Sequence, residues 1–305
     1  MTQGFWENAY AEALPANKKH SNGFFWIGKS REHEENDEFL HDNNGSNSFV
    51  SNAESSGRST RGGDQSSPVN PKVNPRLLES IDWHQAYQQS KQPSILKKIR
   101  DFLNEIWVNI LLNSDEIPKA ILVSSSKEGE GVTYISSHMA LLLALEHDKK
   151  VLYVDTNINK KHKHVFDINV SNGLKNYLTG NVSIDSVIYK TNYDNLFVVP
   201  SGYDAAHPEK VIHMHPSKRL EYFVKYCNEG FDLVFYDGQA IVIYPEMISF
   251  AKFIDQFVMV CLYAETRIEV TKFVLDRLKK NKISIAGVVL NKREYPIPAV
   301  IYKYL

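Results

Sequence analysis

Residues 124–133 read Ser-Ser-Ser-Lys-Glu-Gly-Glu-Gly-Val-Thr, and this stretch decides which fold we expect for the 305-residue chain. Two glycines followed by a threonine are typical of a phosphate-binding loop, whose backbone N–H groups surround phosphate and whose threonine hydroxyl binds Mg²⁺. In such loops a lysine precedes the threonine, but here that position holds Val132. The sequence therefore predicts a nucleotide-binding loop without its usual positive charge.

The segments on either side of this loop fit the strand-loop-helix unit that a phosphate-binding loop requires. Lys119–Ser125 is a short apolar run of the buried-strand type, and Tyr134–Glu146 is rich in Ala and Leu and long enough for a helix. The alternative is an ordinary strand-glycine-helix turn of an α/β protein. The predicted nucleotide contacts in and after the loop are Lys127, Gly129, Glu130, Gly131, Val132, Thr133 and Tyr134.

Two later apolar runs each end on an acid. Residues 150–157 contain Asp155, and residues 231–237 end on Asp237. Parallel strands deliver such residues to the carboxyl edge of a sheet, where α/β proteins bind ligands. Two carboxylates beside a phosphate loop suit Mg²⁺, although each acid alone is equally explained as a helix N-cap. Together with the loop, the pair predicts a magnesium-nucleotide site on a doubly wound, mostly parallel α/β sheet.

In their order along the chain these motifs resemble the cytoplasmic kinase domains of bacterial tyrosine kinases (BY-kinases of the CpsD/CapB type), which are related to the MinD and ParA ATPases. The resemblance begins near Pro93 and implies a P-loop NTPase-like fold that binds ATP or ADP with Mg²⁺. It implies that Thr133, Asp155 and Asp237 hold the metal, that both acids serve catalysis, and that Asn291 lies near the base. The matching segments are residues 125–131, 154–155, 172–180, 196–202, 208–209, 231–237 and 287–291.

The chain departs from the family pattern at the same predicted site. Val132 replaces the loop lysine, Asn157 replaces the second acid of the family's Asp-x-Asp, and residues 238–240 lack the proline-containing turn after Asp237. Losing a charge-assisted contact to phosphate costs about 1.5–3 kcal/mol of binding, and losing a group that stabilises transition-state charge costs roughly 10²–10³-fold in rate. We therefore expect nucleotide binding to be weak or absent.

Lysines near the loop offer one way to replace the missing charge. Lys127 occupies the position of a second lysine in MinD-like loops, which reaches phosphate across a dimer, but an exposed lysine beside Glu128 and Glu130 is more simply solvated. The same two alternatives hold for Lys160, Lys161 and Lys163 after the second strand.

Two further family features concern assembly and phosphorylation. The family's ring-forming Glu-x-x-Arg-x-x-Arg helix corresponds here to Asp101, Asn104 and Trp107, so both arginines are absent. The helix itself carries a stripe of apolar residues at helical spacing, which predicts a buried face. The tail retains candidate phosphate acceptors, although its mixture of aromatic and aliphatic residues also favours packing. The stripe is Ile95, Ile99, Phe102, Leu103, Ile106 and Ile110, and the acceptors are Tyr295, Tyr302 and Tyr304.

The composition limits the remaining functions. The chain is 43% hydrophobic with a net charge of −1, so it can bury one sizeable core and shows no charge excess that favours nucleic acid. Cys261 lies in an apolar run typical of a strand core, and with Cys227 it makes no disulfide framework, consistent with a reducing cytoplasm. No segment approaches the ~20 apolar residues of a membrane span or the pattern of a signal peptide. The pairs His162/His164 and His213/His215 lack further ligands at metal spacing.

The N-terminal quarter differs from the rest in composition. Residues 42–75 are predicted to be a disordered linker, because their few apolar side chains do not offset the entropy of ordering. Residues 1–41 contain isolated aromatic clusters such as Phe24-Phe25-Trp26, which indicate either a strand that packs on the core or a tethered docking motif in a flexible arm. Residues 76–305 then form the P-loop domain, with its core from about residue 94 and a short tyrosine-containing tail.

The resemblance and its departures together lead to the following hypothesis. The protein is a degenerate BY-kinase-like protein, more a pseudokinase than an enzyme, which regulates or scaffolds bacterial capsule or exopolysaccharide biosynthesis and export. Its implied partner is an inner-membrane chain-length determinant (a polysaccharide co-polymerase), through which it reaches the membrane from the cytoplasm, with self-association as a second contact. One alternative is an active ATPase or protein-tyrosine autokinase of the same pathway that tolerates Val132. Another is a MinD/ParA-like positioning protein.

Overall fold

A single mixed sheet forms the centre of the molecule. The computed structural model describes residues 25–28, 93–158, 170, 172–202 and 217–292. Within them, eight strands pair in the order β1-β8-β7-β2-β6-β3-β5-β4, and only the edge strands β1 and β4 run antiparallel to their neighbours. The strands are β1 Phe25–Gly28, β2 Ala120–Ser125, β3 Val151–Asp155, β4 Tyr189–Lys190, β5 Leu196–Val199, β6 Leu233–Asp237, β7 Gln256–Leu262 and β8 Ile285–Asn291.

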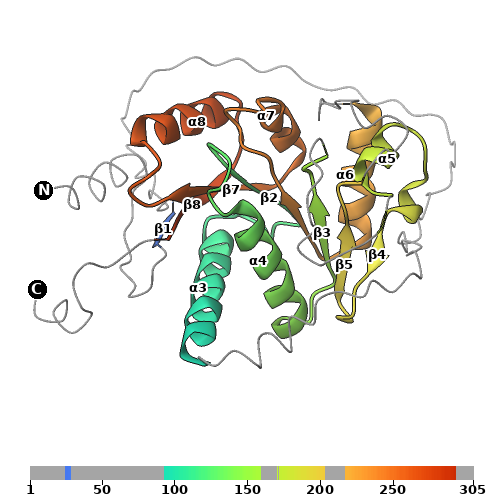
Figure 1. The fold of residues 1–305 in the computed structure, drawn as a ribbon, viewed down its shortest axis with the longest axis horizontal. Helices are drawn as coiled ribbons and strands as arrows, with labels where there is room; N and C mark the ends of the chain where they lie inside the picture. The colour runs from blue at the N-terminus through green and yellow to red at the C-terminus, as the bar shows by residue number, and fades with distance from the viewer. Residues whose placement is uncertain (1–24, 29–92, 159–169, 171, 203–216, 293–305) are drawn as a thin grey trace, which may run out of the picture.

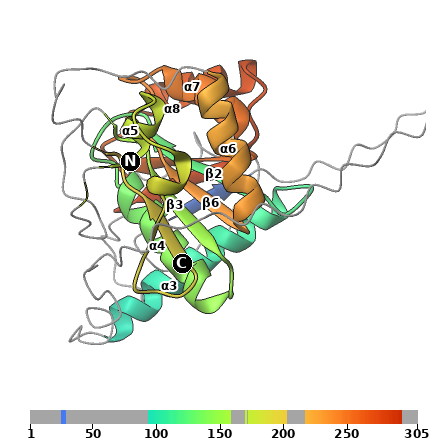
Figure 2. The same cartoon turned by 90° about the vertical axis from the view of Figure 1, so that its right-hand side faces the viewer.

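Helices cover both faces of this sheet (Figure 1). One face is covered by α3 (Pro93–Leu112) and α4 (Val132–Glu146), and the other by α5 (Leu174–Leu178), α6 (Lys218–Gly230), α7 (Glu246–Phe250) and α8 (Ile268–Lys280). Figure 2, at a right angle to this view, shows the sheet between the two layers. Short 3₁₀ turns occur at Ile184–Ser186 and Ala251–Phe253. The structure is the expected doubly wound, mostly parallel α/β fold.

The predicted core strands and the loop helix are confirmed. β2 and β3 lie within the predicted strand segments, and every residue of both is buried. The helix after the loop begins at Val132, two positions before the expected Tyr134. The earlier start follows from Gly131, whose φ of 97° turns the chain directly from the loop into the helix. Val132 is therefore the first residue of α4.

Four of the six residues of the predicted apolar stripe on α3 are buried, Ile99 is partly buried, and the side chain of Ile95 lies outside the described residues. Phe102, Leu103, Ile106 and Ile110 each have 4% or less of their surface exposed, and they belong to the core between α3, α4 and the sheet. Trp107, at the position of a family arginine, packs in the same core at 6% exposure. The helix therefore contributes hydrophobic packing here.

The N-terminal region contributes one strand to the sheet. β1 pairs antiparallel with β8, with Phe25 opposite Leu290 and Gly28 opposite Gly287. Residues 1–41 were expected to form a flexible arm, and these four residues instead follow the strand alternative. The sequence could not decide this, because a four-residue strand is set by the free edge that it joins rather than by its own pattern. The predicted linker at residues 42–75 lies outside the described residues.

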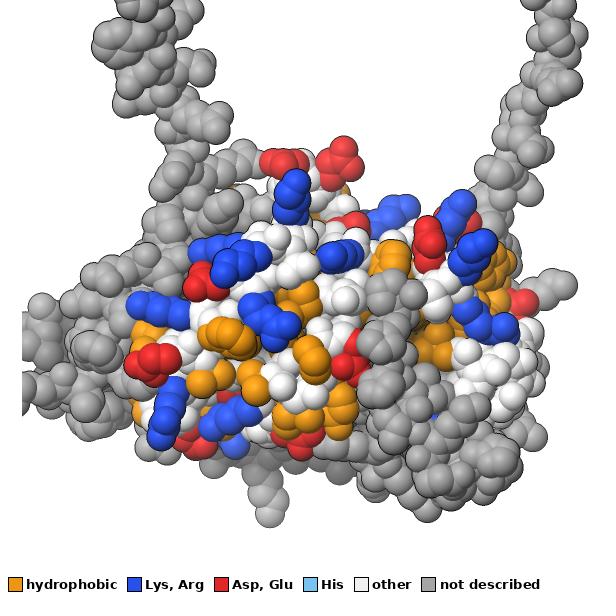
Figure 3. Space-filling view, turned by 90° about the horizontal axis from the view of Figure 1, so that it is seen from above, with side chains coloured by type: hydrophobic (Ala, Val, Ile, Leu, Met, Phe, Trp, Pro, Cys, Tyr) orange, Lys and Arg blue, Asp and Glu red, His pale blue; other side chains and the backbone are white. Residues whose placement is uncertain are grey.

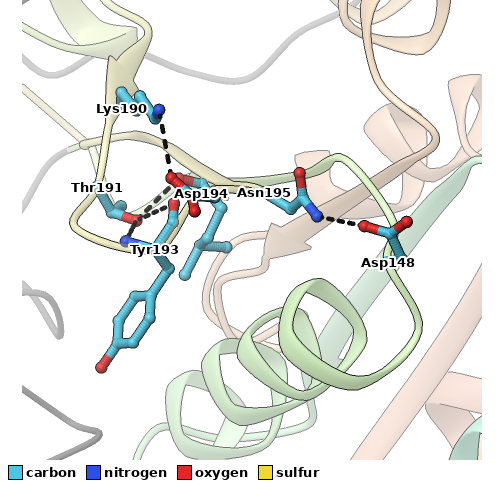
Figure 4. Close-up of polar contacts among 7 residues, drawn as sticks. Asp148, Lys190, Thr191, Tyr193, Asp194 and Asn195 are labelled. Atoms are coloured by element: carbon cyan, nitrogen blue, oxygen red, sulfur yellow. Dashed lines mark hydrogen bonds and ion pairs between the residues drawn. The ribbon is translucent and has the colours of Figure 1, made fainter.

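A polar turn closes the opposite edge of the sheet (Figure 4). In it the Thr191 hydroxyl donates to the Leu196 carbonyl oxygen at 2.8 Å and accepts from the Tyr193 N–H at 3.1 Å. The Asn195 amide donates to Asp148 Oδ1 at 2.8 Å, which ties the turn to the loop before β3. These bonds hold β4 antiparallel to β5.

Two expectations about the rest of the chain can be compared with the structure. Cys261 is fully buried in β7, as predicted, and burial raises the pKa of its thiol to about 12. Among the helices that the structure describes, none combines the length and the apolar character needed to cross a bilayer.

Candidate nucleotide-binding site

The predicted site residues meet at the carboxyl edge of three adjacent strands. β6 lies between β2 and β3, with Asp237 opposite Val123 on one side and opposite Asp155 on the other. The loop after β2 leads into α4, which packs on the face toward which Asp237 points. The parallel register therefore places the loop threonine and both acids in one cluster.

The glycines of the loop adopt conformations that other residues rarely adopt. Gly129 has a φ of 83° and Gly131 a φ of 97°. A Cβ on Gly131 would lie 2.1 Å from Asn291 Nδ2, whereas a Cβ on Gly129 would meet no atom within 4 Å. Asn291 lies so close because its side chain donates to the Glu130 carbonyl oxygen at 2.9 Å. In this structure the Asn291 side chain therefore holds the loop backbone at Glu130 through a hydrogen bond.

A fully buried carboxylate holds the loop together from inside. Glu130 Oε2 accepts from the backbone N–H groups of Ser126 at 2.9 Å and Lys127 at 3.1 Å. The hydroxyl of Ser126 also donates to this carboxylate, and so does the hydroxyl of Thr266, from the turn between β7 and α8. Glu130 is therefore a structural part of the loop, and its backbone remains the part that can face a phosphate.

A second buried carboxylate belongs to Asp237 at the end of β6. Its Oδ2 accepts from the Thr133 hydroxyl at 2.7 Å and the Tyr153 hydroxyl at 2.8 Å, and its Oδ1 accepts from the Ser136 hydroxyl at 3.2 Å. Thr133 and Ser136 lie one turn apart on α4, and Tyr153 comes from β3. Three hydroxyl groups from two elements thus surround one carboxylate.

Burial perturbs the titration of this cluster. Burial first and the nearby Asp155 carboxylate second raise the pKa of Asp237, the hydrogen bonds from Thr133, Tyr153 and Ser136 lower it, and the net pKa is about 7. Burial, together with the charges of Asp237 and Asp155, also raises the pKa of Tyr153 well above its usual value. Tyr153 therefore stays protonated at neutral pH and remains a donor to Asp237.

Asn157 joins the two acids. Its backbone N–H donates to Asp155 Oδ1 at 2.9 Å and its side-chain amide donates to the same oxygen at 3.1 Å. The same amide lies 3.5 Å from Asp237 Oδ2. The side chain of an aspartate at this position, as in the family pattern, would be ionised at neutral pH and could not donate a hydrogen bond to Asp155. The replacement therefore lowers the repulsion between Asp155 and Asp237.

The remaining loop residues do not place a positive charge where the backbone N–H groups of the loop would surround a phosphate. Val132 is 8% exposed and packs in the core between α3 and α4. The ammonium of Lys127 lies 3.5 Å from the Glu265 carbonyl oxygen, against the turn that also holds Thr266. Tyr134 is 38% exposed, and its ring centroid lies 4.0 Å from that of His138.

The donor set fits Mg²⁺ in its chemistry but is already engaged. A threonine hydroxyl and two carboxylates are oxygen ligands of the kind that Mg²⁺ binds, and Thr133, Asp155 and Asp237 are the residues that would hold it. However, Thr133 and Tyr153 both donate to Asp237 Oδ2. A cation at this oxygen would have to displace one of these donors.

Four residues of the site escaped the sequence-based prediction. Tyr153 precedes Asp155 by two positions on the same strand, so strand alternation places both on one face, and Ser136 follows Thr133 by one helical turn. Thr266 gave no signal, because its contact with the loop depends on the β7–α8 turn. Gln239, two residues after Asp237, is 3% exposed, and within the described residues neither the oxygen nor the nitrogen of its side-chain amide has a hydrogen-bond partner.

Several predicted residues lie outside the part of the chain that the structure describes. These are the lysines after β3, the histidine pairs and the candidate phosphate acceptors of the tail: Lys160, Lys161, Lys163, His162, His164, His213, His215, Tyr295, Tyr302 and Tyr304.

Comparisons with known sequences agree with this geometry. A protein-family model described as an AAA domain matches residues 118–242, which run from β2 past Asp237. The tyrosine-protein kinase CpsD of Streptococcus agalactiae is 27% identical over 197 residues, which are 64% of this chain and 84% of that protein. The tyrosine-protein kinase ptk of Acinetobacter johnsonii is 26% identical over 172 residues, which are 56% of this chain but only 23% of that protein.

Solved structures show the same fold. The chimerical protein CapA2B2 superposes with a TM-score of 0.58 at 23% identity, covering 72% of this chain and 95% of that one. The kinase domain of the Escherichia coli tyrosine kinase ETK gives a TM-score of 0.51 at 22% identity, over 59% of this chain and 71% of that one.

The sheet topology and the loop define an α/β domain with a P-loop NTPase-like fold. The chain is similar in sequence to bacterial tyrosine kinases over 56–64% of its length.

Proposed function

We propose that this protein is a catalytically degenerate relative of the bacterial tyrosine kinases, which regulates or scaffolds capsule or exopolysaccharide biosynthesis through protein–protein contacts. The hydrogen bonding around Asp237 is the observation that carries the proposal. The acid that would bind Mg²⁺ accepts instead from Thr133, Tyr153 and Ser136. Together with valine at the lysine position, this arrangement favours weak or absent binding of ATP and ADP.

An active ATPase or tyrosine autokinase is the second candidate, and one observation favours it. Thr133, Asp155 and Asp237 are brought together in the arrangement that a magnesium-nucleotide site requires. In this candidate Lys127 would turn from Glu265 toward the phosphates and replace the missing lysine. Against this candidate, the Lys127 ammonium lies against the Glu265 carbonyl oxygen at 3.5 Å and would have to leave it.

The face formed by α7 and α8 supports a role in protein contacts. Figure 3 shows lysine and arginine side chains interspersed with hydrophobic ones on this face. Phe273 of α8 is 54% exposed beneath the Arg277 guanidinium, and Val242 and Ile243 before α7 are 51% and 53% exposed. Large exposed apolar side chains surrounded by polar and charged ones are typical of an interaction surface. We propose this face for the partner, an inner-membrane chain-length determinant, which would also recruit the protein from the cytoplasm to the membrane.

Calorimetry with Mg²⁺-ATP and with ADP tests the proposal. We expect no binding by the wild-type protein at nucleotide concentrations up to about 1 mM. The free energy of binding would then be weaker than about −4 kcal/mol. Val132→Lys restores the ammonium and should gain about 10–100-fold in affinity. Val132→Met is the matched control, because it adds length without charge and should behave as wild type.

Two results would decide against the pseudoenzyme. Micromolar binding by the wild-type protein that Asp237→Ala abolishes would favour the active kinase or ATPase. Turnover of ATP with phosphate incorporation into the tail tyrosines would establish it. Co-purification of the full chain with the cytoplasmic part of a chain-length determinant tests the partner separately.

A further inference from the structure

Tyr153 contacts Asp237, the candidate metal-binding aspartate. Its ring is 3% exposed and packs in the core between the sheet, α3 and α4. Its hydroxyl donates to Asp237 Oδ2 at 2.8 Å, and the Thr133 hydroxyl donates to the same oxygen at 2.7 Å. A carboxylate oxygen offers two lone pairs, so these donors fill both. A cation that approaches Oδ2 must replace one of them.

The two donors differ in what they lose when a cation enters. The Thr133 hydroxyl can rotate and bind the cation with its own oxygen, as loop threonines do. The Tyr153 hydroxyl is held on a buried ring and has no route to water. Its displacement from Asp237 would therefore remove a hydrogen bond inside the protein, which is expensive in a buried environment.

We propose that the Tyr153 hydroxyl competes with a divalent cation for Asp237 and thereby keeps the site closed to Mg²⁺. This inference rests on the proposed function in one respect, because it treats Thr133, Asp155 and Asp237 as the remains of a magnesium site. Tyr153 acts as a positioning residue, through its hydrogen bond to the Asp237 carboxylate. Asn157, two residues after the end of β3, donates to Asp155 and so engages the second carboxylate of the site.

The chain offers a matched control on the neighbouring strand. Tyr236 lies directly before Asp237, is 1% exposed, and its hydroxyl has no hydrogen-bond partner in the described structure. It belongs to the core on the opposite face of the sheet. Tyr236→Phe therefore removes a buried hydroxyl of the same kind without touching Asp237.

The experiment measures Mn²⁺ binding to the full-length protein by electron paramagnetic resonance, under nitrogen at pH 8.5 so that Asp237 is largely ionised. We expect Tyr153→Phe to bind Mn²⁺ about tenfold more tightly than wild type, because the cation no longer has to displace a buried hydroxyl from Asp237. Tyr236→Phe should equal wild type, and Asp237→Asn in the Tyr153→Phe background should abolish the gain. Tyr153→Leu, which also lacks the hydroxyl, replaces Tyr153→Phe if that variant does not fold.

Three results would overturn the inference. They are equal affinities of wild type and Tyr153→Phe, an equal gain in Tyr236→Phe, and micromolar Mn²⁺ binding by the wild-type protein itself. The last requires no variant. Failure here leaves the proposed function standing if calorimetry still finds no nucleotide binding, whereas tight Mg²⁺-ATP binding by wild type would overturn the proposed function on its own.

Discussion

Two buried carboxylates at the same edge of the sheet differ in what surrounds them. Glu130 accepts from backbone N–H groups of its own loop, which are fixed donors, in addition to the hydroxyls of Ser126 and Thr266. Asp237 accepts its shortest hydrogen bonds from side-chain hydroxyls of α4 and β3, and it lies beside Asp155. The first arrangement stabilises the shape of the loop. The second holds a charge that the fold only partly compensates, which is characteristic of a ligand site.

Removing Glu130 should have the largest effect. Glu130→Ala leaves the buried N–H groups of Ser126 and Lys127 without their acceptor, and we expect the free energy of unfolding to fall by about 3–5 kcal/mol. Urea denaturation measures this change. Glu128→Ala, at an exposed position of the same loop, is the control and should change stability by less than about 0.5 kcal/mol. A loss below about 1 kcal/mol for Glu130→Ala would show that the loop does not depend on its carboxylate.

Asp237→Asn should stabilise the protein, and more so at high pH. The pKa of Asp237 is about 7 in the folded protein and near 4 in the unfolded chain, so the folded state binds the proton more tightly. The stability that this proton contributes is full below pH 4 and is lost as the pH rises through 7. Wild type should therefore lose about 2–3 kcal/mol between pH 5 and pH 8 through this group, and Asp237→Asn should not.

The measurement is urea denaturation of both proteins at several pH values. Asp194→Asn serves as the control, because the Asp194 side chain is 98% exposed. Parallel pH profiles for wild type and Asp237→Asn would mean that Asp237 titrates normally, and the contrast with Glu130 would then disappear.

The smallest effects concern the two loop glycines. Gly131→Ala combines a left-handed φ with a clash against Asn291 and should cost about 2 kcal/mol. Gly129→Ala has the same strain of a left-handed φ without the clash, and it should lower the free energy of unfolding by about 1 kcal/mol. Thermal unfolding of the pair gives the difference. Equal losses would indicate that the Asn291 side chain moves aside freely.

Much of the fold could be predicted because its signals are local. The apolar runs of β2 and β3, the glycines before α4 and the stripe of α3 each lie within about twenty residues and follow known periodicities. The site was predictable only in part. Thr133, Asp155 and Asp237 stand in recognisable motifs, whereas the contacts of Tyr153 with Asp237 and of Thr266 with Glu130 depend on how distant segments align. The pairing of Phe25 with Leu290 likewise depends on how segments far apart in the sequence align.

The two short strands at the borders of the sheet bear on how copies of this protein can meet. β1 has four residues and β4 has two, and both run against the direction of their neighbours. Borders this short offer few unpaired backbone groups to a strand of another molecule. Growth of the sheet from copy to copy is thereby discouraged, and assembly would instead use side chains on the helices that cover its faces.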